Sequence, residues 1–325
     1  MISRLQALVQ ASTRDMNRSF LSALGLVALA DLRVIQYRTA LTGSASFLDT
    51  FLLAPGLHRQ QAAAELNNAE YPAVGAMTTG YIFRVENQAT VSWLLDIGRT
   101  AQLTTVEVLP PSASSQGVFP SVPYLAGVAL TAAVFSKLVA IEDWWALGAL
   151  SVLMLARLLN VIIIKRRTKL GWKGYREKED TRGDLIILLS QDRWVRLRGY
   201  VNDLKIVTSG CWLADMSPLD ILAVNLGTIL TYISPALSSN ATTTGNVLIC
   251  GLLLASAALI GICNTITKDL NMFGRTVRVV GRKEYDRRLT LAHELIEETG
   301  RDDWAIGLGM ITPPKGKEGG VVVAM

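Results

Sequence analysis

The sequence is poor in charge, histidine and cysteine. Only 18% of its 325 residues are charged and 50% are apolar, whereas a typical soluble domain is about 25% charged. A purely soluble fold is therefore not expected. Of the three cysteines, Cys250 and Cys263 lie on one apolar stretch, about 20 Å apart if it is helical. This excludes a disulfide between them, and we interpret Cys211 and these two as small packing residues.

Motifs that carry chemistry are also missing. The run HELIEE at 293–298 begins like a zinc-protease helix, but Glu297 stands where the second histidine belongs. Asn202-Asp203-Leu204-Lys205 resembles half of an aspartate-rich prenyltransferase motif and lacks its second acid. There is no Walker loop, dinucleotide fingerprint or nucleophile elbow. We expect no metal and no cofactor, and the sequence leaves open whether the chain is an enzyme.

What the sequence does have is four long apolar stretches, at 121–141, 144–164, 219–238 and 245–266. Each has the length of about 20 residues that a helix needs to cross a bilayer. Trp144 and Trp145, beside a short turn at Glu142 and Asp143, suit an interfacial aromatic belt. The predicted fold class is an all-α membrane protein with a four-transmembrane-helix bundle.

Three parts of the chain follow from these spans. Residues 1–120 form an N-terminal region that is partly membrane-associated or soluble. Residues 121–266 form the transmembrane domain, with a cytosolic loop at 165–217. Residues 267–325 form a cytosolic C-terminal segment. YIFRVE and TTVEV are short strand candidates within the first part.

The distribution of basic residues predicts the orientation. The net charge of +5 is better explained by positive-inside asymmetry than by nucleic-acid binding, because basic residues cluster beside the spans. The loop between the last two spans has no charge and contains Asn240-Ala241-Thr242, a glycosylation acceptor pattern. We expect both termini in the cytosol, Asn240 in the lumen, and an endoplasmic-reticulum or other secretory-pathway membrane. The basic residues that follow the second and fourth spans are Lys165, Arg166, Arg167, Lys169, Lys173, Arg176, Lys178 and Arg182, and Lys268, Arg275, Arg278, Arg282, Lys283, Arg287 and Arg288.

One feature favours the opposite orientation. Residues 19–30 are apolar, follow a basic leader and end in Ala28-Leu29-Ala30, a triplet typical of a signal-peptide cleavage site. We interpret the run as a membrane-associated or buried helix, since it is short for a span. A cleaved signal peptide would invert the downstream topology, and the Arg-containing start also leaves a mitochondrial address open.

Two segments outside the spans predict ordered structure. The loop at 165–217 mixes apolar residues with charges, which indicates an amphipathic element lying on the membrane face or the bundle. A solvated charged loop is the alternative. Residues 284–299 predict an amphipathic helix whose stripe, including Leu289 and Leu295, docks on that loop or on the membrane. The candidate functional residues of the loop are Asp192, Arg193, Arg196 and Asp203.

Polar residues inside the spans give the main candidate site. Arg157 and Asn160 lie one turn apart, and Asp220 begins the third span from the same side. Ionisable groups at membrane depth are costly, so Asp220 is the expected partner of Arg157. The alternative is that these groups only join helices by hydrogen bonds. The candidate set is Arg157, Asn160, Asp220, Asn225 and Asn264.

Residues 121–311 resemble an uncharacterised family of polytopic membrane proteins from filamentous fungi. The resemblance is carried by RLLNVIIIKRR, LLSQDRWVRLRGYVNDLKIVTSG and RRLTLAHELIEETGRDDWAIGLGMI. It implies an auxiliary or cyclising role on a lipophilic intermediate of natural-product metabolism, and we hypothesise a membrane-embedded cyclase or isomerase that acts on a lipophilic small molecule. A non-catalytic scaffold, or a protein that binds anionic lipid or partners, is the alternative. The bilayer is the partner the sequence predicts, and the oligomeric state stays open.

Overall fold

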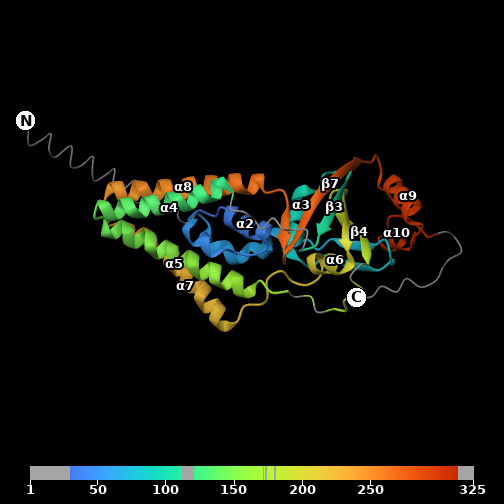
Figure 1. Ribbon diagram of the computed structural model, residues 1–325, viewed down its shortest axis with the longest axis horizontal. Coiled ribbons are helices and arrows are strands. Elements are labelled where there is room, and N and C mark those ends of the chain that lie inside the picture. Colours follow the sequence, from blue (N-terminus) through green and yellow to red (C-terminus); the bar gives the residue numbers. More distant parts are fainter. Residues whose placement is uncertain (1–29, 112–120, 171, 173, 179–180, 314–325) are drawn as a thin grey trace, which may run out of the picture.

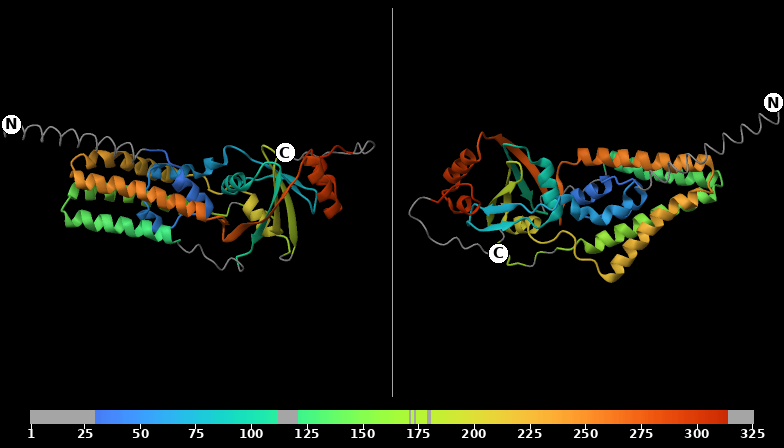
Figure 2. Two further views of the ribbon diagram at one scale, coloured as in Figure 1. Left: turned by 90° about the horizontal axis from the view of Figure 1, so that it is seen from above. Right: turned by 180° about the vertical axis from the view of Figure 1, so that it is seen from behind.

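The computed structural model describes residues 30–111, 121–170, 172, 174–178 and 181–313. The predicted signal-like run at 19–30 therefore lies, except for Ala30, outside the described residues. The molecule is elongated, with long helices along one half and a β-sheet at the other (Figures 1 and 2). We call these halves the helical region and the sheet region.

Four helices of the helical region are long and apolar enough to cross a membrane: α4 (Val122–Ala140), α5 (Trp144–Arg167), α7 (Pro218–Ser238) and α8 (Thr243–Ile266). This confirms the four predicted stretches and fits an integral membrane protein. Helix α5 packs against α7, and α4 against α8. Small residues allow α5 and α7 to approach closely, since Ala156 faces Gly227, and Ser234 donates to the Ala149 carbonyl.

An N-terminal segment lies between the two helix pairs, where they separate toward the sheet (Figure 1). It consists of α2 (Val34–Thr42) and two 3-10 helices, η1 (Phe47–Phe51) and η2 (Leu57–Asn67). Helix α2 packs on α8, η1 on α4 and α5, and η2 on α5 and α7. We call residues 34–67 the wedge. It buries Leu52, Leu53 and Leu57 in the core of the helical region.

The sheet region corrects the all-α prediction. Its seven strands run in the order β2-β1-β4-β5-β3-β7-β6, and all neighbours are antiparallel except β3 and β5. The strand candidates at 81–86 and 104–108 are confirmed as β2 and β3. The strands are β1 (Ala73–Ala76), β2 (Ile82–Arg84), β3 (Gln102–Leu109), β4 (Arg182–Leu189), β5 (Arg193–Tyr200), β6 (Leu270–Met272) and β7 (Arg275–Glu284).

The predicted amphipathic element of the 165–217 loop is instead a β-hairpin, β4–β5, followed by α6 (Val201–Thr208). Ile187, Val195 and Leu197 of the hairpin are buried in one core with α3 (Gln88–Ile97). The same core includes Val161 and Ile164 from the end of α5. The sheet region is therefore packed directly onto the helical region.

The C-terminal helix α9 (Arg288–Thr299) ends at Gly300, which has the left-handed conformation of a helix stop (φ 66°). Short helix α10 (Asp303–Gly307) follows. Leu295 is 1% exposed, whereas Leu289 is 49% exposed. Leu295 packs in a core with Ile186 and Trp194, so the helix docks on the strands of the 165–217 loop through a narrower stripe than predicted.

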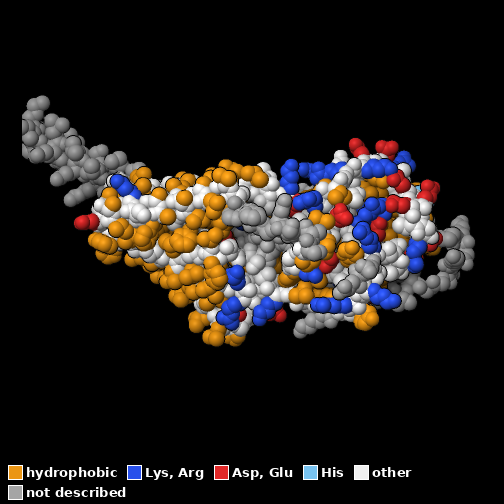
Figure 3. Space-filling model, in the orientation of Figure 1, with side chains coloured by type: hydrophobic (Ala, Val, Ile, Leu, Met, Phe, Trp, Pro, Cys, Tyr) orange, Lys and Arg blue, Asp and Glu red, His pale blue; other side chains and the backbone are white. Residues whose placement is uncertain are grey.

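The sheet joins three segments of chain: residues 73–109 precede α4, 182–200 lie between α5 and α7, and 270–284 follow α8. The two helical hairpins, α4–α5 and α7–α8, thus each return the chain to the same side. The turns of these hairpins lie at the other end, where Asp143 accepts hydrogen bonds from the Thr242 backbone N–H (2.9 Å) and hydroxyl (2.6 Å). Charged side chains gather over the sheet region and apolar ones over the helical region (Figure 3).

Candidate functional site

Two predicted site residues, Arg157 and Asn160, face the wedge. Arg157 is 3% exposed and donates from Nε to the Asp49 carbonyl (3.1 Å) and from Nη1 to Gln60 Oε1 (2.6 Å). Asn160 donates to the Leu57 carbonyl (3.3 Å) and accepts from Gln61 Nε2 at its Oδ1 (3.3 Å). The wedge therefore satisfies the polar groups of α5 with neutral acceptors and donors.

Asp220 is not the partner of Arg157. It caps its own helix, accepting from the Ser217 backbone N–H (3.1 Å) and hydroxyl (2.7 Å), and pairs with Arg166 at 3.4 Å. The nearby carboxylate in the wedge is that of Asp49, whose Oδ1 accepts from the Tyr124 hydroxyl at 2.7 Å. Ser217, three residues before Asp220, is a capping-box signal that identifies this role from sequence. Asn225 is exposed on the outer face of α7.

The four loop candidates lie at separate places in the sheet region. Asp192 lies exposed in the β4–β5 turn, and Arg193 donates to the Leu95 carbonyl (2.9 Å). Asp203 pairs with Arg275 at 2.8 Å. None of these contacts involves Arg157 or its partners Asp49 and Gln60.

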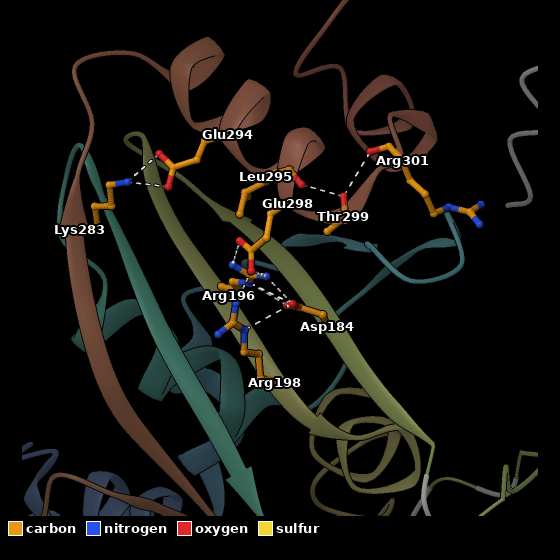
Figure 4. A network of polar contacts seen from close by, with 9 residues as sticks. All are labelled: Asp184, Arg196, Arg198, Lys283, Glu294, Leu295, Glu298, Thr299 and Arg301. Atoms are coloured by element: carbon orange, nitrogen blue, oxygen red, sulfur yellow. Dashed lines mark hydrogen bonds and ion pairs between the residues drawn. The ribbon is translucent and has the colours of Figure 1, made fainter.

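Arg196 is the centre of an ion-pair network between β5 and α9 (Figure 4). It contacts Asp184 and Glu298, each at 2.6 Å, and Arg198 also reaches both carboxylates. The Arg196 guanidinium holds the pKa of the Glu298 carboxyl below its usual range. The network fixes α9 on the sheet.

Asn264 marks a different site. Its Nδ2 donates to the Val34 carbonyl (2.9 Å), while its Oδ1 is buried and has no hydrogen-bond partner within the described part of the chain. The side chain lies on the wall of a cleft of about 1070 Å³ where the helical and sheet regions meet. We call it the junction cleft. Its lining comes from Arg33, Val34, Tyr37 and Leu66, from Trp93, Asp96, Ile97 and Arg99, from Gly261, Asn264, Thr265, Thr267 and Lys268, and from Val279, Val280, Gly281 and Arg282.

Positive charge dominates the junction cleft. Arg33, Arg99 and Lys268 are exposed, and their side chains make no hydrogen bond or ion pair with any residue that the structure describes. The single carboxylate of the lining, Asp96, accepts from the Tyr37 hydroxyl at 2.9 Å. Burial, together with Asp96, raises the pKa of Tyr37, which keeps the phenol protonated.

Sequence reasoning found Asn264 and missed the rest of the cleft. The lining comes from four segments that are far apart in the chain and are brought together by long-range packing of α2, α3 and α8 and by the sheet. Across residues 30–111, 121–170 and 181–313, no group of three or more His, Cys, Asp or Glu could hold a metal ion. Compared with protein-family models, curated proteins and solved structures, the chain has no match.

Proposed function

We propose that this chain is a membrane-embedded binding protein whose junction cleft takes a lipophilic molecule with an acidic group. The observation that carries the proposal is the combination of unpaired cations and apolar walls at the sheet end of α8. Arg33, Arg99 and Lys268 supply the charge, and Val34 and Ile97 are among the apolar residues of the lining.

The chemistry of the lining suits an amphiphile. An acidic headgroup would gain roughly 1 kcal/mol from each basic side chain near a membrane surface. The buried Oδ1 of Asn264 would accept a hydrogen bond from a hydroxyl of the ligand. A volume of about 1070 Å³ is comparable to pockets for small organic ligands, which span roughly 300–1000 Å³.

Binding is tested with the full chain in detergent, by displacement of a fluorescent fatty acid with oleate. Reversing the charges in Arg99→Glu/Lys268→Glu should weaken oleate binding by about tenfold for each residue. Arg84→Glu is the matched control, because Arg84 is an exposed arginine on the edge strand β2, outside the cleft lining. Oleyl alcohol should bind much more weakly than oleate. Equal oleate affinity in the double variant and the control would refute the proposal.

The proposed orientation places the sheet region in the cytosol, in an endoplasmic-reticulum or other secretory-pathway membrane, with Asn240 in the lumen. It is supported by the basic residues beside the sheet-side helix ends and the uncharged turn at Asn240. Cys211 is exposed in the sheet region, whereas Cys263 is buried. A membrane-impermeant maleimide should label Cys211 in sealed microsomes without permeabilisation. Labelling only after permeabilisation would show the opposite orientation.

A second candidate function is proton-transfer catalysis on the same ligand, as a cyclase or isomerase of fungal natural-product metabolism would need. The observation that favours it is the Tyr37–Asp96 hydrogen bond on the cleft wall, a protonated phenol next to an exposed carboxylate. A strain carrying Tyr37→Phe should then accumulate the same precursor as a deletion strain, while the purified variant still binds oleate. A normal metabolite profile would exclude this role for Tyr37.

A further inference from the structure

A second cavity, of about 230 Å³, is lined by Arg38 and Thr42 in the second half of α2, whereas Arg33, Val34 and Tyr37 at the start of this helix line the junction cleft. This second cavity is an open pocket lined by α2, the turn after it, η1 and α4. Gly43 begins the turn with φ +69°, and an added Cβ would lie 2.2 Å from the Asn271 carbonyl oxygen, so the turn is held in place. The lining residues are Arg38, Thr42, Ser44, Ala45, Ser46, Leu48, Asp49 and Tyr124.

The guanidinium of Arg38 is buried beside this cavity with few partners. Arg38 is 7% exposed, and Nη1 donates to Thr267 Oγ1 at 2.8 Å. The Tyr124 ring lies 6.0 Å from the guanidinium carbon. No other hydrogen bond and no ion pair joins the Arg38 side chain to the rest of the described chain. A guanidinium has five N–H donors, so most of its hydrogen-bonding capacity is unused.

The carboxylate that lines the same cavity, that of Asp49, makes no hydrogen bond or ion pair with Arg38. Asp49 Oδ1 accepts from the Tyr124 hydroxyl (2.7 Å), and Oδ2 accepts from the Ser46 backbone N–H (2.8 Å). Arg157 lies on the other side of Asp49 and bonds to its carbonyl. The Asp49 carboxylate lies near Arg157, and no carboxylate among the described residues forms an ion pair with Arg38, so the positive charge of Arg38 has no ion-pair partner there. Burying an unpaired charge is costly, and an anion in the cavity removes that cost.

The rim of the cavity matches the membrane interface. Phe47 and Leu48 are 58% and 44% exposed, next to the polar turn. Lys165, in the last turn of α5, places Nζ 4.8 Å from the centre of the Phe47 ring. Exposed apolar side chains beside a lysine are typical of the boundary between acyl chains and headgroups.

We propose that this cavity is an anion site in which Arg38 binds a phosphate monoester or a carboxylate, with the hydroxyls of Ser44 and Ser46 as further donors. Its occupant is an acidic lipid headgroup or a soluble anion, since both present the same oxygens to a guanidinium. The site rests on a different cation from the proposed function, because Arg33, Arg99 and Lys268 line the junction cleft and Arg38 does not; the two are neighbours, since Thr267, the hydrogen-bond partner of Arg38, lines the junction cleft.

The test measures the thermal midpoint of the full chain in detergent with inorganic phosphate, and separately with dioctanoyl phosphatidate, at constant ionic strength. Ligand that binds the folded state raises the midpoint. We expect a rise in the wild type with at least one of the two probes, and the responding probe identifies the source. Arg38→Met should abolish the rise, and Arg84→Met, an exposed arginine on β2, should retain it.

Ser44→Asp keeps the test decisive if Arg38→Met fails to fold. An aspartate at the cavity wall supplies the missing carboxylate, so this variant should have a higher midpoint than the wild type and should not respond to either probe. The proposal is overturned if neither probe shifts the wild type, or if Ser44→Asp responds as the wild type does.

Discussion

The helical and sheet regions each bury an arginine, and they do so in opposite ways. In the sheet region Arg196 lies between two carboxylates, Asp184 and Glu298, each 2.6 Å away. In the helical region Arg157 bonds only to neutral acceptors, the Asp49 carbonyl and Gln60 Oε1. The difference indicates how each region tolerates buried charge: by ion pairs where water is near, and by backbone and amide groups where apolar helices surround the site.

The neutral acceptors of Arg157 come from the wedge, which indicates what this segment contributes to the helical region. Membrane-length helices use their own carbonyls for internal hydrogen bonds and have few to spare. The short 3-10 helices and turns of residues 47–67 offer carbonyls that can accept a second hydrogen bond, such as that of Asp49, which accepts from both the Leu52 N–H and Arg157, next to buried amides such as Gln60. The wedge therefore packs in both regions, with Leu52, Leu53 and Leu57 in the core of the helical region and Ala40, Leu41 and Ala63 in the core of the sheet region.

The largest effect is expected from removing the buried cation of the helical region. Arg157→Met leaves Gln60 Oε1 and the Asp49 carboxylate without their charged neighbour, and should lower the free energy of unfolding by about 3–5 kcal/mol. Unfolding in detergent with increasing SDS measures it. Lys137→Met, an exposed lysine on α4, is the control and should change stability little. Equal stability of both variants would show that the wedge does not depend on Arg157.

In the sheet region the largest effect is expected from Leu295→Asp on α9, which places a charge in the core. Leu295 is 1% exposed, so an aspartate there should cost a few kcal/mol. Leu289→Asp lies on the same helix but at a side chain that is 49% exposed, and should change stability by less than about 0.5 kcal/mol. Thermal unfolding of the two variants compares the two faces directly. Similar losses at both positions would mean that α9 is buried on both faces.

A smaller effect is expected at the far end of the helical region, where Asp143 joins the two turns. Burial raises the pKa of Asp143, but hydrogen bonds from Thr242 and Ala146 outweigh it and lower the pKa. The carboxylate thus stabilises the fold above the ordinary aspartate pKa, and this contribution is lost as pH falls through the lowered value. Asp143→Asn should cost about 1–2 kcal/mol at pH 7, and the difference from wild type should shrink toward pH 3. A difference in unfolding free energy between the wild type and Asp143→Asn that stays constant with pH would contradict this.

The smallest expected value is a coupling energy near zero between Arg157 and Asp220. They have different partners, Gln60 for Arg157 and Ser217 for Asp220, so the losses in Arg157→Met and Asp220→Asn should add to within about 0.5 kcal/mol. Arg157→Met and Gln60→Leu, which remove the two ends of one hydrogen bond, should instead be strongly non-additive. A large coupling in the first pair would restore the pairing predicted from the sequence.

The sequence predicts local features of this chain well and long-range ones poorly. The four apolar helices follow from composition alone, and the β2 and β3 strands follow from short patterns. The sheet could not be foreseen, because its strands come from three segments that apolar helices separate. The partner of Arg157 was missed for the same reason, since Gln60 is 97 residues away and no local pattern marks its amide as the partner of a buried arginine.

The most direct test of the proposed function is photo-crosslinking of the full chain in native membranes with a diazirine-bearing fatty acid. If the junction cleft is the binding site, the label should appear in peptides from the sheet end of α8 and from β7, which contribute Asn264 and Val280 to the lining. Arg99→Glu/Lys268→Glu should remove this label and leave any diffuse labelling of exposed α7 unchanged. Labelling confined to the outer faces of the long helices, and equal in the variant, would contradict the account.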